Sequence, residues 1–532
     1  MKTIETDILI VGSGITAALM AARLAETTTR SITVVEAGRA STPFAERGKA
    51  RDRYLAYGEN PWARDHLDDQ NALGTTWGYS PNMHVGGLAM HWGGVSPRYS
   101  PEDFTTRSLY GIGDDWPYTY DDLDPFYQEA EERMGVAGEQ GPPALDPRGK
   151  PYPLPPLPIN YNLAQLQQWA TSAGIASWST PSAKNSIARD GRAQCQRCDT
   201  CYPVCPTGAK YSPDFTWDAL VAAKKITLIP ETLVRRLVAD PATGRIVRAT
   251  GNRTDATGEE VTIEAKTFVL AGGFVWSPHL LLLSRDSAYP DGLANRSGLV
   301  GKYLAGHRNV GAQITLPMEL YPGINTQHSL VSKQFQRASY RGRYLRHDLR
   351  IWESSAGRGP RLRGDDGAPL FGDALLADWQ QRAKGATARV RAYYDVLPDK
   401  ESKLVLDSAR KNRFGDPMPH VAFRDAPESA ALVEWQEERL RELFTRMAKA
   451  GGGDVRFQNS ANDLGQEHPT GGCRMGSDPT TSVVDGWGRA HDHENLWVAG
   501  APAQVSASCC NGTLTFVAVG LRTAAGVAKA SA

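Results

Sequence analysis

The stretch DILIVGSGITA, residues 7–17, decides the fold of this chain. Its first five residues are mostly apolar and β-branched, which predicts a short buried strand of a parallel sheet. The alanine-rich segment Ala17–Ala25 that follows predicts a helix. Between the two, Gly12 allows a tight turn, Gly14 lets the backbone approach a pyrophosphate at the helix N-terminus, and Ala17 keeps the helix close to the strand. The stretch therefore predicts a dinucleotide-binding turn.

A second predicted strand, Ile32–Val35, ends at Glu36. An acid at this position accepts hydrogen bonds from the ribose hydroxyls of a dinucleotide, and its charge disfavours a 2′-phosphate. The order of these features is strand, turn, helix, strand and acid, which is the order required by the dinucleotide-binding fingerprint. This part of the chain predicts dinucleotide binding without distinguishing FAD from NAD.

The bulk composition argues against several other classes of protein. The 532 residues suggest roughly two to four domains. Lys plus Arg and Asp plus Glu both count 59, so a net charge of zero gives no reason to expect nucleic acid or an anionic membrane as a partner. No apolar run reaches the roughly 18–20 residues of a membrane span, and Met1–Asp7 shows no export signal.

Four of the seven cysteines form the pattern C-x2-C-x2-C-x3-C-P: Cys195, Cys198, Cys201 and Cys205, followed by Pro206. Bacterial ferredoxin-type chains hold iron–sulfur clusters with this spacing. Structural zinc sites also use four thiolates, and four buried thiols without a metal are a third interpretation. The spacing and the terminal Cys-Pro favour an iron–sulfur cluster over the other two.

Other segments of the chain carry recognisable motifs: VGGLAMHW at 85–92, DWP at 115–117, FVLAGG at 268–273, SPH at 277–279, EHPTGGCRMG at 467–476 and NGTLT at 511–515. We expect Ser277-Pro278-His279 to cap a leucine-rich helix. Together with residues 7–17, these segments make the chain resemble the glucose–methanol–choline (GMC) flavin oxidoreductases over nearly its whole length. Within that family it is most similar to the large subunits of bacterial sugar dehydrogenases, which include FAD-dependent glucose, fructose, gluconate and glucoside 3-dehydrogenases.

The resemblance implies FAD rather than NAD as the cofactor. It also implies an α/β fold, in which a Rossmann-like FAD-binding domain of the GMC and p-hydroxybenzoate-hydroxylase type is joined to an α+β substrate domain built on an antiparallel sheet. The predicted FAD-binding domain is discontinuous and takes residues 1–130, 190–310 and 461–532, including the cysteine segment 195–206. The predicted substrate domain takes residues 131–189 and 311–460.

Two polar residues near the C-terminus, His468 and Asn511, are the predicted catalytic pair. Removal of hydride from a sugar carbon needs the neighbouring hydroxyl to lose its proton, and histidine is the base suited to neutral pH. A second polar group must hold the same oxygen. The resemblance assigns the first role to His468 and the second to Asn511. A turn histidine before Pro469 and a capping asparagine are the alternative interpretations.

The resemblance further implies which residues contact FAD: Gly12, Gly14, Ala17, Glu36, Gly86, Gly87, His91, Trp92, Val234, Gly272, Gly500, Ala501, Thr513 and Leu514. Many relatives place an Asp or Ser at the position of Gly500, so no side-chain role is carried over there, and Ala501 is included as its neighbour. Several sugar-oxidising relatives have a histidine at the position of His91 that bonds covalently to the flavin 8-methyl carbon. A neutral histidine hydrogen-bonded beside the ring, or packed against Trp92, is the alternative.

In the dehydrogenases that the chain resembles, cysteines matching Cys195, Cys201 and Cys205 hold a three-iron cluster. Cys198 is then an extra thiol, which either completes a four-iron cluster or stays outside it. We therefore expect [3Fe–4S] rather than [4Fe–4S]. A cluster beside FAD gives the reduced flavin a one-electron exit, which is a further reason to prefer iron–sulfur to zinc.

The sequence as a whole predicts an FAD-dependent dehydrogenase that acts on a secondary or anomeric CH–OH group of a sugar or glycoside, of the glucoside 3-dehydrogenase or glucose dehydrogenase type. His468 takes the hydroxyl proton, hydride goes to flavin N5, and electrons leave through the cluster to a cytochrome c. The alternatives are an oxidase of the same fold with structural cysteines, a flavin and iron–sulfur electron-transfer subunit without its own substrate, and an alcohol or sterol as substrate. Relatives are exported with a small companion subunit that carries a twin-arginine signal, which favours the periplasm slightly over the cytoplasm.

Overall fold

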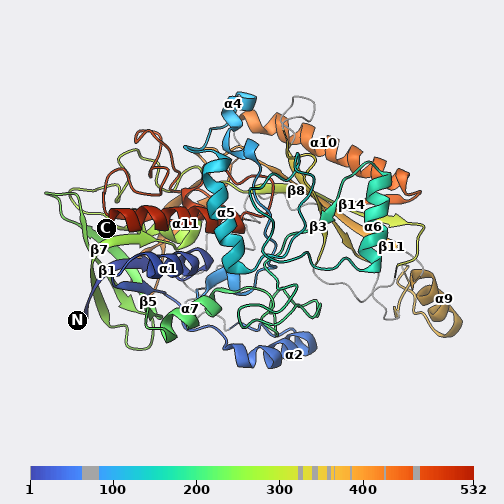
Figure 1. Ribbon diagram of the computed structural model, residues 1–532, viewed down its shortest axis with the longest axis horizontal. Helices are drawn as coiled ribbons and strands as arrows, with labels where there is room; N and C mark the ends of the chain where they lie inside the picture. Colours follow the sequence, from blue (N-terminus) through green and yellow to red (C-terminus); the bar gives the residue numbers. More distant parts are fainter. Residues whose placement is uncertain are drawn as a thin grey trace.

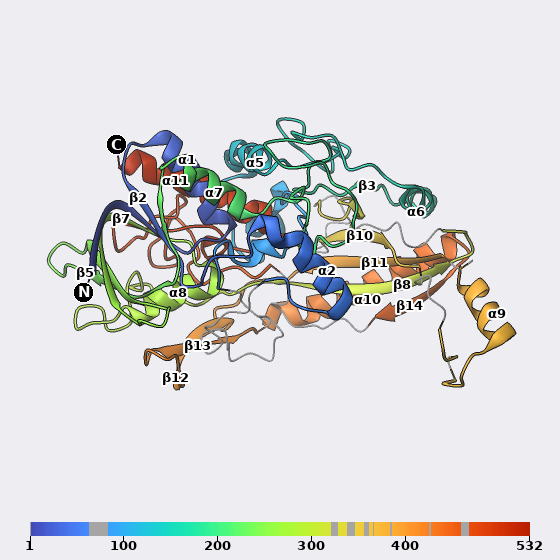
Figure 2. The same cartoon turned by 90° about the horizontal axis from the view of Figure 1, so that it is seen from below.

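The computed structural model describes residues 2–62, 83–320, 328–337, 346–355, 361–364, 366–383, 386–424, 427–458 and 468–531. The motif residue Glu467 and the predicted domain boundary at 460–461 lie outside these ranges. Within them the chain forms two large sheets with helices packed against them, as Figure 1 and Figure 2 show. None of the described helices is long and apolar enough to span a bilayer.

The first sheet is built around the predicted nucleotide-binding strand. In the described part of the chain it has seven strands in the order β4-β2-β1-β7-β6-β5, and β15 also pairs with β7. Pairing is parallel among β1, β2, β4, β7 and β15 and antiparallel among β5, β6 and β7. The bounds are Lys2–Val11 (β1), Ile32–Val35 (β2), Thr227–Ile229 (β4), Thr232–Ala239 (β5), Ile246–Arg253 (β6), Glu260–Leu270 (β7) and Leu496–Val498 (β15).

The strands predicted at residues 7–11 and 32–35 are confirmed, and their carboxyl ends meet at one edge of the sheet. Val11 is in register with Val35 on one side and with Leu270 on the other. Because ligands of open α/β sheets bind beyond the carboxyl ends of the strands, this edge is where a dinucleotide is expected.

Helices from distant parts of the chain pack beside this sheet: Ile15–Thr27 (α1), Tyr120–Met134 (α5), Pro213–Ala222 (α7), Gly273–Leu283 (α8) and Thr513–Ala530 (α11). α1 packs against α7 and α11, and α11 packs against α5. In Figure 2 α1, α7 and α11 gather on one side of the sheet. The contact between α1 and α11 brings the C-terminal motifs next to the nucleotide turn.

The start of α8 differs from the prediction. Ser277 does not cap this helix but lies inside it with Pro278, because the helix begins at Gly273 with Gly272 as its N-cap. Gly273 has a φ of +76°, so the chain turns within three residues of the end of β7 and the helix starts early. The Ser277 hydroxyl instead accepts a hydrogen bond from the Gly272 backbone nitrogen at 3.1 Å.

The second sheet is antiparallel, with six strands in the described residues in the order β14-β8-β11-β10-β9-β3. Their bounds are Trp178–Ser179 (β3), His307–Leu316 (β8), Leu330–Ser332 (β9), His347–Glu353 (β10), Ala386–Asp395 (β11) and Asp454–Gln458 (β14). The long helix Pro427–Ala450 (α10) runs along this sheet in Figure 1, and Tyr161–Ser172 (α6) packs against both the sheet and α10.

The two faces of the second sheet differ in polarity because successive side chains of a strand alternate. One face packs into a single apolar cluster with α6 and α10 through residues such as Val310, Ala312, Leu349 and Ile351. The intervening positions place His307, Asn309, Asp348 and Arg350 on the opposite face. The sheet therefore turns buried polar side chains away from its helices.

The remaining elements are Arg47–Tyr57 (α2), Thr106–Tyr110 (α4), Gly372–Ala383 (α9), Lys403–Lys411 (β12) and Pro417–Ala422 (β13). β12 and β13 form a hairpin that packs against α8 beside the first sheet. This hairpin belongs to the predicted substrate domain, and the division of the chain into domains stays a prediction.

Candidate active site

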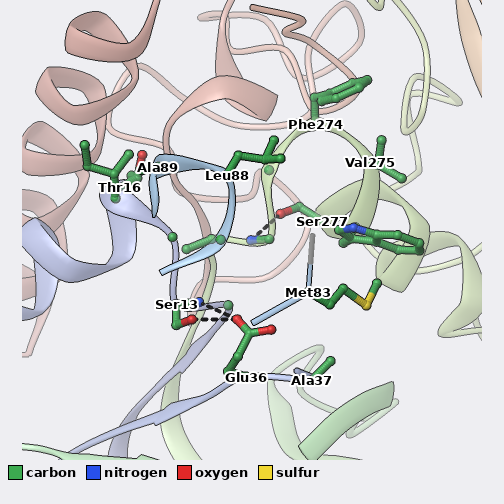
Figure 3. Close-up of a pocket in the computed structure, with 18 of the residues that line it drawn as sticks. Ser13, Thr16, Glu36, Ala37, Met83, Leu88, Ala89, Phe274, Val275 and Ser277 are labelled. Carbon is green, nitrogen blue, oxygen red and sulfur yellow. Dashed lines mark hydrogen bonds between the residues drawn. The ribbon is translucent and has the colours of Figure 1, made fainter. Parts of the chain in front are cut away.

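The nucleotide turn between β1 and α1 is tied to the end of β2 by the carboxylate of Glu36. Its Oε2 accepts hydrogen bonds from the Ser13 backbone nitrogen at 3.1 Å and from the Ser13 hydroxyl at 2.6 Å, as Figure 3 shows. Its Oε1 accepts from the backbone nitrogen of Gly38 at 3.0 Å. Three donors thus fix this buried carboxylate beside the turn. The predicted contact of Glu36 with ribose hydroxyls stays a prediction.

Two glycines shape the turn in different ways. Gly12 has a φ of +99°, and a Cβ at this position would lie 2.8 Å from the carbonyl oxygen of Ala271. Gly14 is the N-cap of α1, and a Cβ placed on it would meet no heavy atom within 4 Å. The first turn of α1 has no acidic residue and no side-chain cap. Its backbone N–H groups and the positive end of its dipole are therefore available to an anion.

A cavity of about 1300 Å³ opens at this turn and extends to His468. Figure 3 shows Leu88 and Ala89 on one side of it and Phe274 and Val275 on the other. Its wall contains these predicted FAD contacts: Gly12, Gly14, Glu36, Gly87, His91, Trp92, Val234, Gly272, Ala501 and Thr513. Four other predicted contacts lie outside that wall: Ala17, Gly86, Gly500 and Leu514.

Several wall residues have no counterpart in the sequence prediction. Tyr202 and Pro203 enter from the cysteine segment, and Asn412 and Asp416 enter from the turn of the β12–β13 hairpin. The Asp416 carboxylate accepts from the guanidinium of Arg235 at 2.6 Å, which ties the hairpin to β5. No local motif marks these residues, because their place depends on packing between distant segments.

The predicted catalytic residues His468 and Asn511 lie side by side. Nε2 of His468 is 3.0 Å from Nδ2 of Asn511, and both side chains are partly buried. His468 lines the cavity and has a φ of +54°, which turns the chain sharply at this point. Asn511 stands two residues before α11. The structure thus brings together two residues that are 43 positions apart in the chain.

Three residues of the second sheet stand behind this pair and were missed by the sequence prediction. Nε2 of His307 lies 3.1 Å from Nδ1 of His468. Nη2 of Arg350 donates to Oδ1 of Asn511 at 2.9 Å, and Nε of Arg350 donates to Oδ2 of Asp348 at 2.8 Å. For Asp348 and Arg350 a signal exists in the sequence, because ionisable residues alternate with apolar ones in β10, a strand that is otherwise buried.

His91 ends the short helical turn Gly87–Met90 and lines the cavity. Burial lowers the pKa of His91 to about 4, and the charges of His84 and Lys210 lower it further. The ring therefore stays neutral at pH 7. Its edge meets the ring of Tyr202, with the two centroids 6.0 Å apart.

The thiols of the cysteine segment differ in their surroundings. Burial raises the pKa of Cys195, although a hydrogen bond from the backbone of Arg197 opposes the shift. The Sγ of Cys198 lies 3.6 Å from the hydroxyl of Thr200, and the Sγ of Cys205 lies equally far from the hydroxyl of Thr207. Among the residues that the structure describes, no three His, Cys, Asp or Glu side chains are arranged to hold a single metal ion.

Lys210 joins the cysteine segment to the segment around His91. Its buried ammonium donates to the carbonyl oxygens of Met90, Trp92 and Cys201 at 3.1, 2.7 and 2.8 Å. Burial lowers the pKa of Lys210 to about 8, although negative charge on Cys201 and Cys205 opposes this shift. The cysteines and the cavity wall are therefore parts of one hydrogen-bonded unit.

Known proteins of one family match the chain over nearly its full length. The family described as GMC oxidoreductase matches residues 182–309 and 398–520. The fructose dehydrogenase large subunit of Gluconobacter japonicus is 32% identical, with 98% of each chain covered. The 6'''-hydroxyparomomycin C oxidase of Streptomyces lividus is 28% identical, over 98% of this chain and 91% of that protein.

A solved structure shares the fold. The pyridoxine 4-oxidase of Mesorbium loti superposes with a TM-score of 0.63 at 18% identity, with 98% of each chain covered. The predicted family and the predicted fold class are both confirmed by these matches.

Proposed function

The chain belongs to the GMC oxidoreductase family, and on that premise we propose that it is an FAD-dependent dehydrogenase of a secondary or anomeric hydroxyl of a sugar or glycoside. Membership makes it an FAD-dependent oxidoreductase of CH–OH groups. The finer proposal depends on one observation: a single cavity joins the nucleotide turn to the side chain of His468, which contacts Asn511.

The nucleotide end of the cavity fits FAD. The open space at Gly14 and the N-terminus of α1 suit the pyrophosphate, and the carboxylate of Glu36 stands where a ribose is expected. His91, Trp92 and Gly272 line the stretch between this end and His468. When bound, FAD supplies the two-electron acceptor for the hydrogen on the substrate carbon.

The catalytic end suits the deprotonation of a hydroxyl. A substrate oxygen that replaces the direct contact between the two side chains donates its proton to Nε2 of His468 and accepts a hydrogen bond from Nδ2 of Asn511. His468 then holds the proton while Asn511 stabilises the negative charge that develops on the oxygen. The carbon that bears this oxygen loses its hydrogen more readily once the oxygen is charged.

The sugar substrate is supported by the relatives, since the 32% identical protein is named for fructose. Anaerobic mixing with sugars, glycosides and simple alcohols tests it, with bleaching of the flavin absorbance as the readout and NMR of the product to locate the new carbonyl. We expect a sugar or glycoside to bleach the flavin. Bleaching by simple alcohols and by none of the sugars would overturn the proposal. Peroxide formation as fast as dye reduction would instead indicate an oxidase.

We further propose that Cys195, Cys201 and Cys205 hold a [3Fe–4S] cluster through which electrons leave. The spacing of the cysteine run supports it, as does the position of Tyr202 and Pro203, two residues of the same segment, on the cavity wall.

Two matched variants test the cluster. Cys198→Ser is expected to keep the iron content and the EPR signal of the oxidised protein, because the three-cysteine pattern of the similar dehydrogenases needs no thiol at this position. Cys201→Ser is expected to lose both. Equal loss in the two variants would favour a four-iron cluster, and stoichiometric zinc without iron would end the idea.

A covalent bond between His91 and the flavin is part of the proposal. Its ring is neutral, as a nucleophilic imidazole must be, and it lines the cavity. Acid precipitation tests the bond: a yellow pellet is expected, and a colourless pellet with FAD in the supernatant would exclude it.

The proposed acceptor is a cytochrome c, reached with a small companion subunit in the periplasm. The companion subunit is supported by the relative named as a large subunit. Purification of a tagged chain from fractions of its native host tests the proposal, with a co-purifying small protein in the periplasmic fraction as the expected result. Recovery of the chain alone in the cytoplasm would contradict it.

A further inference from the structure

The catalytic pair is the middle of a longer chain of hydrogen bonds that begins in the second sheet. Asp348 and Arg350 lie on β10, are almost fully buried, and form an ion pair at 2.8 Å. Arg350 also donates from Nη2 to the side-chain oxygen of Asn511 at 2.9 Å. Because a guanidinium can donate but never accept, this bond fixes which way the Asn511 amide points.

The direction of the amide determines where the proton of His468 sits. With its oxygen turned to Arg350, Asn511 presents its NH2 group to Nε2 of His468 at 3.0 Å. An NH2 group donates, so Nε2 must carry the lone pair. In a neutral imidazole the other nitrogen, Nδ1, then carries the hydrogen.

The next bond continues in the same direction. Nδ1 of His468 lies 3.1 Å from Nε2 of His307, so His468 donates and His307 accepts. Burial lowers the pKa of His307 well below its usual value, and the charges of His468, Arg391 and Arg350 act the same way, while the backbone of Ser508 opposes them. His307 is therefore neutral, and its own hydrogen sits on Nδ1.

We propose that His307 is a positioning residue: it accepts the Nδ1 hydrogen of His468 and, with the amide of Asn511 oriented by Arg350, fixes His468 in the tautomer that presents a lone pair at Nε2. This inference rests on the proposed function, because the lone pair serves a substrate hydroxyl. It extends the predicted pair of His468 and Asn511 in two directions. One is the path from Asn511 through Arg350 to Asp348, and the other is the hydrogen bond from His468 to His307.

The same arrangement decides where the proton stays after it leaves the substrate. When Nε2 of His468 takes the proton, the positive ring still donates from Nδ1 to His307 and gains a stronger hydrogen bond. His307 cannot take that proton over, because it is buried among the charges of Arg350 and Arg391. His307 thus orients the base and stabilises its charged form without relaying the proton.

Two substitutions separate the acceptor from the bulk of the ring. In His307→Gln the side-chain oxygen can still accept from Nδ1 of His468, whereas in His307→Met the bulk remains without a strong acceptor. We expect flavin reduction within about threefold of wild type in His307→Gln and at least about tenfold slower in His307→Met, as for the loss of a bond to a charged group. In His307→Met the acid limb of the pH profile moves to lower pH, because the protonated base has lost its partner. His307→Gln as slow as His307→Met would overturn the proposal, and so would a His307→Met variant with the wild-type rate.

A second measurement decides the tautomer without any turnover. The protein has 11 histidines, and ¹⁵N-histidine NMR of the wild type compared with His468→Gln identifies the two ring nitrogens of His468. We expect a protonated Nδ1 and an unprotonated Nε2. A hydrogen on Nε2 would overturn the inference even if sugar oxidation is confirmed. The expected tautomer in a protein that oxidises no sugar would instead leave the inference standing and refute the proposed function.

Discussion

The two ends of the cavity are built in opposite ways. At the nucleotide end, the turn at Gly12 and Gly14 and the carboxylate of Glu36 lie within one short stretch of chain, and backbone N–H groups make much of the site. At the catalytic end, His307 of β8, Arg350 of β10, and the loop residues His468 and Asn511 meet through side chains alone. The first site is local in sequence, and the second needs both sheets in place.

This difference determines what each site can tolerate. The nucleotide turn depends on backbone angles and on a parallel register that neighbouring residues enforce. The catalytic network depends on the polar face of the second sheet, so a change on that face reaches the base through one to three hydrogen bonds. Substitutions at the two ends should therefore separate cofactor binding from chemistry.

The same difference explains what the sequence could reveal. The strands at 7–11 and 32–35 and the helix after Gly14 were predictable because their signals are local periodicities. His307 was not, because its partner lies 161 positions away and no motif surrounds it. The start of α8 was misplaced because Ser-Pro is typical of a helix start, whereas the two glycines before it already turn the chain. Lys210 was missed because its acceptors are backbone carbonyls, which have no sequence signature.

The largest expected effect is at the catalytic end. His468→Ala is expected to slow flavin reduction at least about 100-fold, because it removes the base that takes the hydroxyl proton. The FAD content should equal that of the wild type, since the nucleotide end is built separately. Stopped-flow absorbance with the best substrate measures the rate, and the flavin-to-protein ratio measures the content.

An exposed histidine provides the control for this change. His420→Ala, on β13, removes the same side chain from the surface and should leave the rate unaltered. A His468→Ala variant that reduces its flavin at nearly the wild-type speed would exclude the base assignment. A variant that loses its FAD would show that the two ends are not independent.

A smaller effect is expected at the nucleotide end. Glu36→Gln keeps the shape but replaces one carboxylate oxygen by an amide nitrogen, so an acceptor for Ser13 or Gly38 is lost. We expect the dissociation constant for FAD to rise about tenfold, as for one lost hydrogen bond of a charged group. FAD titration into apoprotein measures it, in a His91→Asn background where no covalent link can form.

If the two ends of the cavity are independent, the Glu36→Gln change must leave the rate of flavin reduction unaltered. At saturating FAD, Glu36→Gln should reduce its flavin at the rate of the background protein. Glu46→Gln, an exposed carboxylate in the turn Phe44–Glu46, is the matched control and should bind FAD normally. A lower rate of flavin reduction in Glu36→Gln at saturating FAD would contradict the separation.

The smallest expected effect is on the pH dependence of stability. It distinguishes a structural histidine from one that takes up and releases a proton in the reaction. His279 of α8 lines the cavity, and its Nε2 lies 2.9 Å from the carbonyl oxygen of Pro417. Burial lowers the pKa of His279 to about 4, although this hydrogen bond and the charge of Asp416 oppose the shift. In the unfolded chain the pKa returns to about 6.5. Between pH 7 and pH 6 the unfolded state therefore takes up more protons than the folded state, and stability falls as the pH falls.

Over that interval His279 accounts for a loss of about 0.7 kcal/mol, while carboxylates hardly titrate. The thermal midpoint should be lower at pH 6 than at pH 7, and His279→Gln should reduce the difference without changing the pH profile of flavin reduction. His468→Gln should alter the pH profile of flavin reduction, since the proton on His468 belongs to the reaction. If His279→Gln moved the kinetic profile and left the stability difference unchanged, the nucleotide half would share in the proton chemistry, and the division of labour between the two ends would be wrong.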